Sequence, residues 1–139
     1  MNSVIKGVDW IEFEAHGDER GSLVAIENFK NINFPIKRVY YIYDTKSDVV
    51  RGKHAHKNLN QVLLCVNGSC DVLVDNGNER QIVSLNKRNK GIYIHGFIWR
   101  EMMNFSNDAV LLVLVDQEYK VDDYVYDIET VREAANSSK

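Results

Sequence analysis

Short apolar and β-branched segments, each followed by turn residues, repeat along most of this chain. Segments 38–43, 61–66, 71–74, 80–85, 91–94 and 109–116 have the length and composition of strands. Hairpin-type turns separate three consecutive segments of this series, at Asn67-Gly68-Ser69 and at Asp75-Asn76-Gly77-Asn78. Strands at this regular spacing predict an all-β sandwich or barrel.

Helical character is confined to the C-terminal tail, at 127–135, which ends in polar residues. Pro35, the only proline, stands just before the strand expected from residue 38, where a missing amide hydrogen is tolerated. The sequence contains no internal repeat, low-complexity tract or proline-rich linker. We therefore expect a single domain over residues 1–139.

The composition is that of an ordinary globular protein, with 139 residues, 45% of them hydrophobic and 27% charged. A formal charge of −3 gives no reason to expect nucleic acid or an anionic membrane as a partner. No apolar run approaches the ~18 residues of a membrane span, and the first residues lack a signal-peptide pattern. We expect a cytoplasmic protein in which Cys65 and Cys70 are buried thiols rather than a disulfide.

Two histidines one residue apart are the most informative feature of the sequence. Side chains alternate along a strand, so His54 and His56 are expected to point to the same side. Followed by Gln61 and Gly68, they give the spacing H-x-H-x4-Q-x6-G. This spacing resembles the first motif of the cupin barrels and predicts that fold.

Metal-binding cupins have a glutamate at the third position of this motif and a further histidine in a second motif. Here Gln61 stands at the glutamate position. Arg100, in the segment Trp99 to Asn104, stands at the position of the further histidine. A neutral amide is a poor ligand, and a guanidinium does not deprotonate to coordinate a cation. We therefore predict no metal and no cofactor, and two imidazoles that move protons instead.

Basic and aromatic residues near the two motifs are candidates for binding a substrate. Arginine forks suit phosphate oxygens, so an anionic ligand is the natural partner of Arg100. Tyr40 shares its strand parity with Arg38, so both are expected to face the cavity, and Trp99 could stack on a ring. The basic candidates are Arg20, Arg38, Arg51, Lys53 and Arg100.

Most of the chain resembles the sugar-nucleotide 3,4-ketoisomerases, which act on dTDP-4-keto-6-deoxyglucose. The resemblance is carried by segments 20–27, 36–44, 51–56, 61–63 and 99–102. It implies a small cupin (jelly-roll) β-barrel and a metal-free transfer of a proton between C3 and C4 through an enediol. The 3-keto product of such enzymes is used to make 3-amino-3,6-dideoxysugars for surface polysaccharides, including O-antigen.

The resemblance also implies roles for individual residues. His54 and His56 would be the base and the proton shuttle, assisted by Tyr40, and Arg51 and Gln61 would hold the hexose. The remaining basic groups (Arg20, Arg38, Lys53 and Arg100) would hold the pyrophosphate, with Trp99 beside them. The family forms homodimers in which N-terminal strands exchange between subunits.

Several alternatives remain open at this point. A dTDP-sugar 3,5-epimerase also removes a proton next to a ketone, a non-catalytic cupin could bind a sugar nucleotide, and a metal-dependent cupin would use the same fold. Family members yield either the galacto or the gluco product, and they vary at the positions of Arg20 and Arg100. Arginine at both positions matches neither pattern, so both products stay open.

Overall fold

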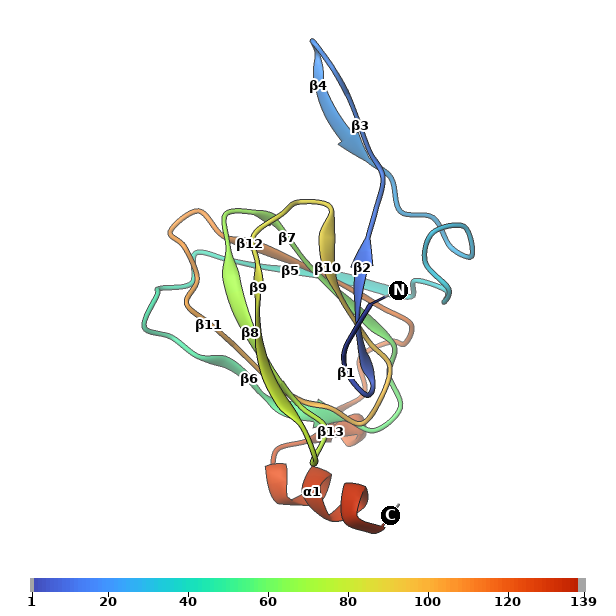
Figure 1. Cartoon of the computed structure of the whole chain (residues 1–139), viewed down its shortest axis with the longest axis vertical. Helices are drawn as coiled ribbons and strands as arrows, with labels where there is room; N and C mark the ends of the chain where they lie inside the picture. Colours follow the sequence, from blue (N-terminus) through green and yellow to red (C-terminus); the bar gives the residue numbers. More distant parts are fainter. Residues whose placement is uncertain (1, 138–139) are drawn as a thin grey trace.

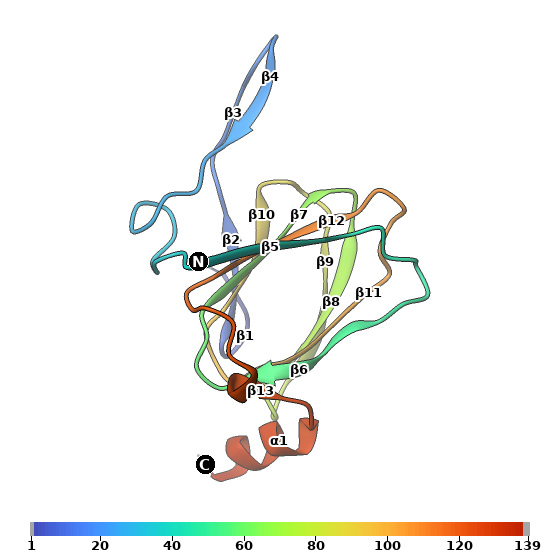
Figure 2. The same cartoon turned by 180° about the vertical axis from the view of Figure 1, so that it is seen from behind.

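A computed structural model of the chain describes residues 2–137 and contains two antiparallel sheets that face each other (Figures 1 and 2). The six-stranded sheet has the order β1 (Ser3–Ile5), β2 (Val8–Glu12), β10 (Lys90–Ile94), β7 (Gln61–Asn67), β12 (Val110–Val115), β5 (Arg38–Tyr43). The five-stranded sheet has the order β13 (Tyr124–Val125), β6 (Arg51–His56), β11 (Trp99–Met103), β8 (Cys70–Asp75), β9 (Arg80–Leu85).

The main core fills the space between the two sheets. β7, β10 and β12 contribute inward-facing side chains such as Leu63, Ile92 and Val113, which pack with Val72 and Val83 of the opposite sheet. Each of these five residues has at most 3% of its surface exposed. Alternate residues of each strand make this layer, as expected for a sandwich with two inner faces.

The outer face of each sheet is also covered in part. A second apolar cluster, including Phe13, Phe34 and Leu64, lies where the segment before β5 crosses the six-stranded sheet. On the other sheet, Trp99 and Leu73 pack with Val131 of helix α1 (Ile128–Ser137). A short 3-10 helix, η1 (Val121–Asp123), leads into β13 and brings the C-terminal segment onto β6.

One hairpin does not join either sheet. β3 (Ala15–Asp18) and β4 (Gly21–Val24) pair only with each other and extend away from the rest of the molecule (Figures 1 and 2). Every residue of β3 is exposed, and Leu23 of β4 has 60% of its surface exposed. A two-stranded ribbon of this kind has little core of its own to hold it in place.

The predicted all-β jelly-roll class is confirmed, with two separate sheets rather than a barrel closed by hydrogen bonds. The expected strands all form, and the expected tail helix runs over Ile128–Ser137. Cys65 and Cys70 are buried free thiols, as predicted. Within residues 2–137 there is no helix with the length and apolar character needed to cross a membrane.

Candidate active site

The two histidines of β6 face the space between the sheets. Their ring centroids are 4.7 Å apart and the rings meet edge-on at 85°. Ala55 between them points outward and packs in the apolar cluster beneath α1. β11 runs antiparallel to β6 with Arg100 paired to His54, so the guanidinium and both imidazoles belong to one layer.

An irregularity in β6 sets the direction of these side chains. Arg100 pairs with His54 but the next residue, Glu101, pairs with Gly52, so Lys53 is an extra residue in β6. Gly52 and Lys53 both have positive φ, of 87° and 53°. A φ of 87° strains any residue other than glycine, and a Cβ on Gly52 would also lie 3.1 Å from the backbone oxygen of Arg100, so glycine is favoured here. The bulge leaves Lys53 exposed to solvent.

A cavity of about 440 Å³ opens in front of His54. Arg38, Tyr40 and Arg51 line it together with His54, which brings four of the predicted site residues to one place. The guanidinium carbon of Arg38 lies 5.4 Å from the centre of the Tyr40 ring, and its buried Nε has no hydrogen-bond partner among the described residues. The remaining wall consists of Ile42, Gly52, Met102, Tyr119, Tyr124 and Tyr126.

His56 lies behind His54 and is almost fully buried. Its Nδ1 is 3.0 Å from Oδ2 of Asp123, and its Nε2 is buried without a partner among the described residues. Burial lowers the pKa of His56 to about 3, with Arg100 and His54 adding to the effect and Asp123 opposing it. Burial likewise lowers the pKa of His54, so both imidazoles are neutral at pH near 7.

Arg100 is the largest fully buried side chain, with 2% of its surface exposed. It donates to the amide oxygen of Gln61 and, from Nε and a terminal nitrogen, to the backbone oxygen of Ile98 at 3.4 and 3.2 Å. Burial lowers the pKa of Arg100 to about 10, which leaves the guanidinium charged. Burial raises the pKa of Tyr40, so its hydroxyl keeps its proton and can donate it.

This donor set does not fit a metal ion. Gln61 offers its oxygen to Arg100, and the guanidinium occupies the layer in which metal-binding cupins place a further histidine. Among residues 2–137, no group of three or more histidine, cysteine, aspartate or glutamate side chains is placed to hold a metal. The absence of a metal from the reaction stays a prediction.

Three residues expected at the site lie elsewhere in this chain. Trp99 points to the opposite face of β11, where it packs with Leu73 and donates to Oε2 of Glu101 at 2.9 Å. Lys53 is exposed at the bulge and does not line the cavity. Arg20 lies in the β3–β4 hairpin with 85% of its side chain exposed and is paired with Asp18 at 2.6 Å.

The C-terminal side of the cavity consists of residues that were not predicted from the sequence. Tyr124 contacts both imidazoles, at centroid distances of 5.0 Å to His54 and 4.4 Å to His56, and stacks on Tyr126 at 5.9 Å. Tyr119 lies 5.5 Å from the guanidinium carbon of Arg38. The i, i+2 spacing of Tyr124 and Tyr126 was the available signal, because it places two aromatic rings on one face of a strand.

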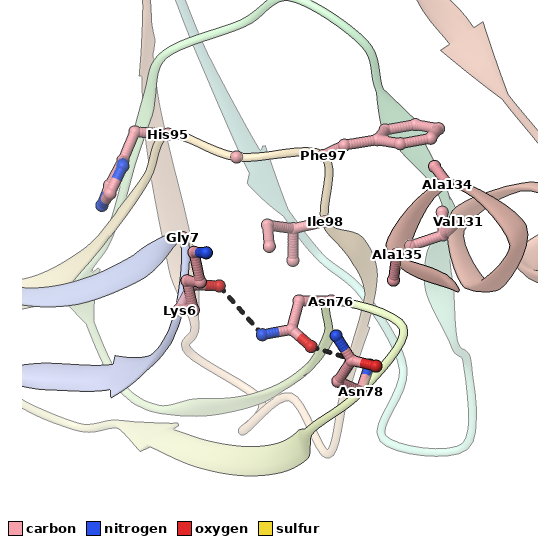
Figure 3. Close-up of a pocket in the computed structure, with 11 residues that line it drawn as sticks. Lys6, Gly7, Asn76, Asn78, His95, Phe97, Ile98, Val131, Ala134 and Ala135 are labelled. Carbon is pink, nitrogen blue, oxygen red and sulfur yellow. Dashed lines mark hydrogen bonds between the residues drawn. The ribbon is translucent and has the colours of Figure 1, made fainter. Parts of the chain in front are cut away.

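A second cavity of about 400 Å³ lies where α1 approaches the turns at the end of both sheets (Figure 3). Asn76 spans part of it by donating to the backbone oxygen of Lys6 at 3.0 Å. The imidazole on its rim, His95, has its Nε2 2.8 Å from Oδ2 of Asp9. None of the predicted site residues lines this cavity, so the cavity in front of His54 is the candidate active site.

Comparison with known proteins points to one class of enzyme. The family model described as FdtA, WxcM-like, C-terminal, matches residues 6–136. A TDP-4-oxo-6-deoxy-alpha-D-glucose-3,4-oxoisomerase from Aneurinibacillus thermoaerophilus is 52% identical over 115 residues, which cover 83% of each chain.

Solved structures agree with this result. A 3,4-ketoisomerase from Helicobacter canadensis is 46% identical, with a TM-score of 0.88 over 93% of this chain and 97% of its own. QdtA, a sugar 3,4-ketoisomerase from Thermoanaerobacterium thermosaccharolyticum in complex with TDP, is 38% identical. The TM-score is 0.93, and the match covers 97% of this chain and 98% of the QdtA chain. A histidine-to-asparagine mutant of QdtA is in complex with TDP-4-keto-6-deoxyglucose.

Proposed function

The chain belongs to the FdtA family of sugar-nucleotide 3,4-ketoisomerases, and from this we propose that it converts dTDP-4-keto-6-deoxyglucose into its 3-keto isomer. The observation that carries the proposal is the pair of neutral, adjacent imidazoles at the end of a cavity lined by arginine and tyrosine. A neutral imidazole accepts a proton at neutral pH, which is the step that a ketone isomerisation needs.

The reaction moves two hydrogens and needs no external oxidant or reductant. The C4 carbonyl acidifies the hydrogen on C3, and a base removes it while O4 takes up a proton, which gives an enediol. A proton is then delivered to C4 and the proton on O3 is released, so the carbonyl is now at C3. One acid-base group near each end of the enediol is sufficient for this exchange.

We assign the transfer between the carbons to His54. His54 lines the cavity, whereas His56 is buried behind it and contacts it edge-on. A base must come within hydrogen-bond reach of the proton that it removes, and this favours the ring at the cavity surface. The Tyr40 hydroxyl, which also lines the cavity, then exchanges protons with O3 and O4, and His56 acts as the proton shuttle behind His54.

Arg100 supplies the positive charge that offsets the enediolate. Among the described residues its guanidinium donates hydrogen bonds to two neutral oxygens, from Gln61 and Ile98, and the Asp123 carboxylate interacts with it through its charge without a hydrogen bond. The charge therefore remains available to an anion that develops in the neighbouring cavity. In a buried site, a fixed charge of this kind lowers the barrier more than it would in water.

The outer part of the cavity suits the nucleotide. Arg38 and Arg51 can neutralise a pyrophosphate, and the buried Nε of Arg38 has a free donor for it. Tyr119 and Tyr126 are both exposed and offer flat faces on which a pyrimidine ring can stack. Lys53 is exposed and is not among the residues that line this cavity, so its place in substrate binding has no support from this arrangement.

We further propose a homodimer in which the β3–β4 hairpin crosses to the partner. Seven of the eight strand residues of the hairpin are exposed, and the hairpin extends away from both sheets of its own chain (Figures 1 and 2). Arg20 at its turn is remote from the cavity of its own chain and can bind substrate only if the hairpin reaches another subunit. Contact with the partner subunit would also bury Leu23, which is exposed in the single chain.

The place of the reaction in metabolism follows from its product. A 3-keto sugar nucleotide is a substrate for amination at C3, so a sugar-nucleotide aminotransferase would act next, towards a 3-amino-3,6-dideoxysugar. We propose that this takes place in the cytoplasm. The two free, buried thiols, Cys65 and Cys70, are in keeping with a reducing compartment.

Proton NMR of dTDP-4-keto-6-deoxyglucose in D2O with the purified protein tests the proposed reaction. We expect a 3-keto product that carries deuterium at C4, whose H4 coupling in ordinary water distinguishes the galacto from the gluco isomer. His54→Asn should abolish both product and exchange, while His95→Gln, outside the cavity, should retain them.

The same spectra separate the alternatives. Deuterium entering C5 would indicate a 3,5-epimerase and would contradict the proposal. Saturable binding of the sugar nucleotide with no exchange at C3 or C4 would favour a non-catalytic binding protein. Activity that disappears with a chelator and returns with a divalent metal would favour a metal-dependent cupin.

A further inference from the structure

A carboxylate from the C-terminal segment holds the buried histidine of the site. Oδ2 of Asp123 lies 3.0 Å from Nδ1 of His56, although the two residues are 67 positions apart in the chain. The other oxygen, Oδ1, accepts hydrogen bonds from the backbone N–H groups of Lys57 and Asn58, at 3.1 and 3.0 Å. Only 12% of the Asp123 side chain is exposed, so the carboxylate is fixed on both sides.

These contacts determine which ring nitrogen of His56 carries the hydrogen. An ionised carboxylate only accepts hydrogen bonds, so the nitrogen that faces Asp123 must be the donor. The neutral ring is then protonated at Nδ1 and has a bare lone pair at Nε2. Nε2 is the buried ring nitrogen that has no partner among the described residues, so nothing in the protein competes for its lone pair.

We propose that Asp123 is a positioning residue that locks His56 in the Nδ1–H tautomer and so leaves Nε2 as the atom at which this histidine takes up a proton when it acts as the shuttle behind His54. The inference rests on the proposed isomerase function and adds to it a residue that acts through His56. Asp123 fixes the ring orientation and stabilises the imidazolium that forms when Nε2 takes up a proton. The same arrangement of a carboxylate and an imidazole makes histidine an effective base in other enzymes.

The charges around His56 make this contribution necessary. Arg100 on β11 and His54 on the same strand both disfavour a proton on His56, as does burial, and Tyr124 on β13 packs against the ring without a charge. Asp123 is the group that opposes them. Without it, a proton on Nε2 would meet only burial and repulsion, and His56 would be a poor acceptor.

The local fold keeps Asp123 in place. The residue ends η1, and Tyr124 directly after it pairs with His56 as β13 joins β6. The backbone of Lys57 also donates to the backbone oxygen of Asp123 at 3.3 Å. The carboxylate is therefore set by the docking of residues 121–125 onto β6, and His56 has its partner only when this segment is in place.

Asp123→Asn provides a sharp test because the amide keeps the shape and loses one acceptor. The backbone N–H groups of Lys57 and Asn58 retain the amide oxygen, so the NH2 group turns towards Nδ1 of His56 and donates to it. His56 must then carry its hydrogen on Nε2. Asp122→Asn, the same change at the exposed preceding residue, is the matched control.

Nitrogen-15 NMR of the imidazoles reads the tautomer directly and needs no substrate. We expect the unmodified protein and Asp122→Asn to show His56 protonated at Nδ1, and Asp123→Asn to show it protonated at Nε2. We also expect kcat of Asp123→Asn to fall by about 10²–10⁴-fold with KM for the sugar nucleotide little changed. A merely structural role of Asp123 would lower the folded fraction and leave the tautomer as it was.

Two results would overturn the inference: an Nε2–H tautomer of His56 in the unmodified protein, or an Nδ1–H tautomer and normal kcat in Asp123→Asn. If Asp123→Asn does not fold, the tautomer of His56 in the unmodified protein still tests the inference: Nδ1–H supports it and Nε2–H contradicts it. Failure of the unmodified protein to isomerise the sugar nucleotide would instead count against the proposed function, because the tautomer is measured without turnover.

Discussion

The guanidinium of Arg100 donates a hydrogen bond to the amide oxygen of Gln61, and both side chains are buried to 2% exposure. These two residues stand where metal-binding cupins have a histidine and a glutamate. The two substitutions in the metal-binding pattern are therefore hydrogen-bonded to each other. The Gln61 amide oxygen accepts a hydrogen bond from the buried guanidinium, and this oxygen is then no longer available to a metal ion. A buried positive charge is thereby kept beside the cavity, and among the described residues it donates hydrogen bonds to neutral oxygens rather than to a carboxylate.

This pairing predicts that the two residues are energetically coupled. Gln61→Leu leaves part of a buried guanidinium without an acceptor and should lower the free energy of unfolding by about 1–3 kcal/mol. Arg100→Met leaves a buried amide oxygen unpaired and should cost a similar amount. The double variant should be destabilised by less than the sum, with a coupling of about 0.5–3 kcal/mol in urea denaturation. Additive losses would show that the bond contributes nothing to stability.

Part of this site could be predicted from strand alternation alone. His54 with His56, and Arg38 with Tyr40, share a face because side chains repeat with period 2, and the structure places them so. The same alternation turns Trp99 away from the cavity once Arg100 faces inward, so strand alternation already argues against placing both residues at the site. Two further features have no local pattern, namely the bulge that exposes Lys53 and the docking of Asp123 onto His56 from 67 residues away.

Tyr40 is expected to act in catalysis and not in folding. Burial raises the pKa of its phenol, so the hydroxyl remains protonated and can donate to a sugar oxygen throughout the neutral range. Tyr40→Phe removes that donor and should lower kcat by about 10–100-fold, with the midpoint of unfolding nearly unchanged. Tyr41→Phe is the matched control, because Tyr41 follows on β5, points to the opposite face and is 61% exposed. Equal kcat values in both variants would remove Tyr40 from the mechanism.

Stability should decrease as the solution becomes acidic, and His56 should contribute to the decrease. Its pKa is about 3 in the folded protein, against about 6.5 when unfolded. Between these values the unfolded chain binds more protons, so the free energy of unfolding falls as pH falls, by up to about 1.4 kcal/mol per pH unit. Urea titrations at several pH values across this window measure the slope.

A substitution identifies the source of this slope. His56→Gln should be less stable at neutral pH but should show a shallower decrease on acidification, because one titrating group has been removed. His16→Gln, at an exposed position of the β3–β4 hairpin, should keep the slope of the unmodified protein. An unchanged slope in His56→Gln would mean that acid sensitivity arises elsewhere.

Exchange of the hairpin between subunits predicts a specific pattern of complementation. Arg20→Ala and His54→Asn should each reduce kcat/KM strongly, since one removes a substrate contact and the other the base. Co-expression with two different affinity tags allows the mixed dimer to be isolated. If Arg20 acts across the dimer, one of its two sites combines an intact His54 with an intact Arg20 from the partner, and the other site carries both defects. The mixed dimer should then recover about half of the unmodified activity.

The opposite result is equally clear. If the hairpin folds back onto its own barrel, each site of the mixed dimer carries one defect and no activity returns. Recovery of activity therefore requires that Arg20 and His54 of one site come from different chains. Since 85% of the Arg20 side chain is exposed in this structure and its partner is Asp18 of the same hairpin, we expect recovery.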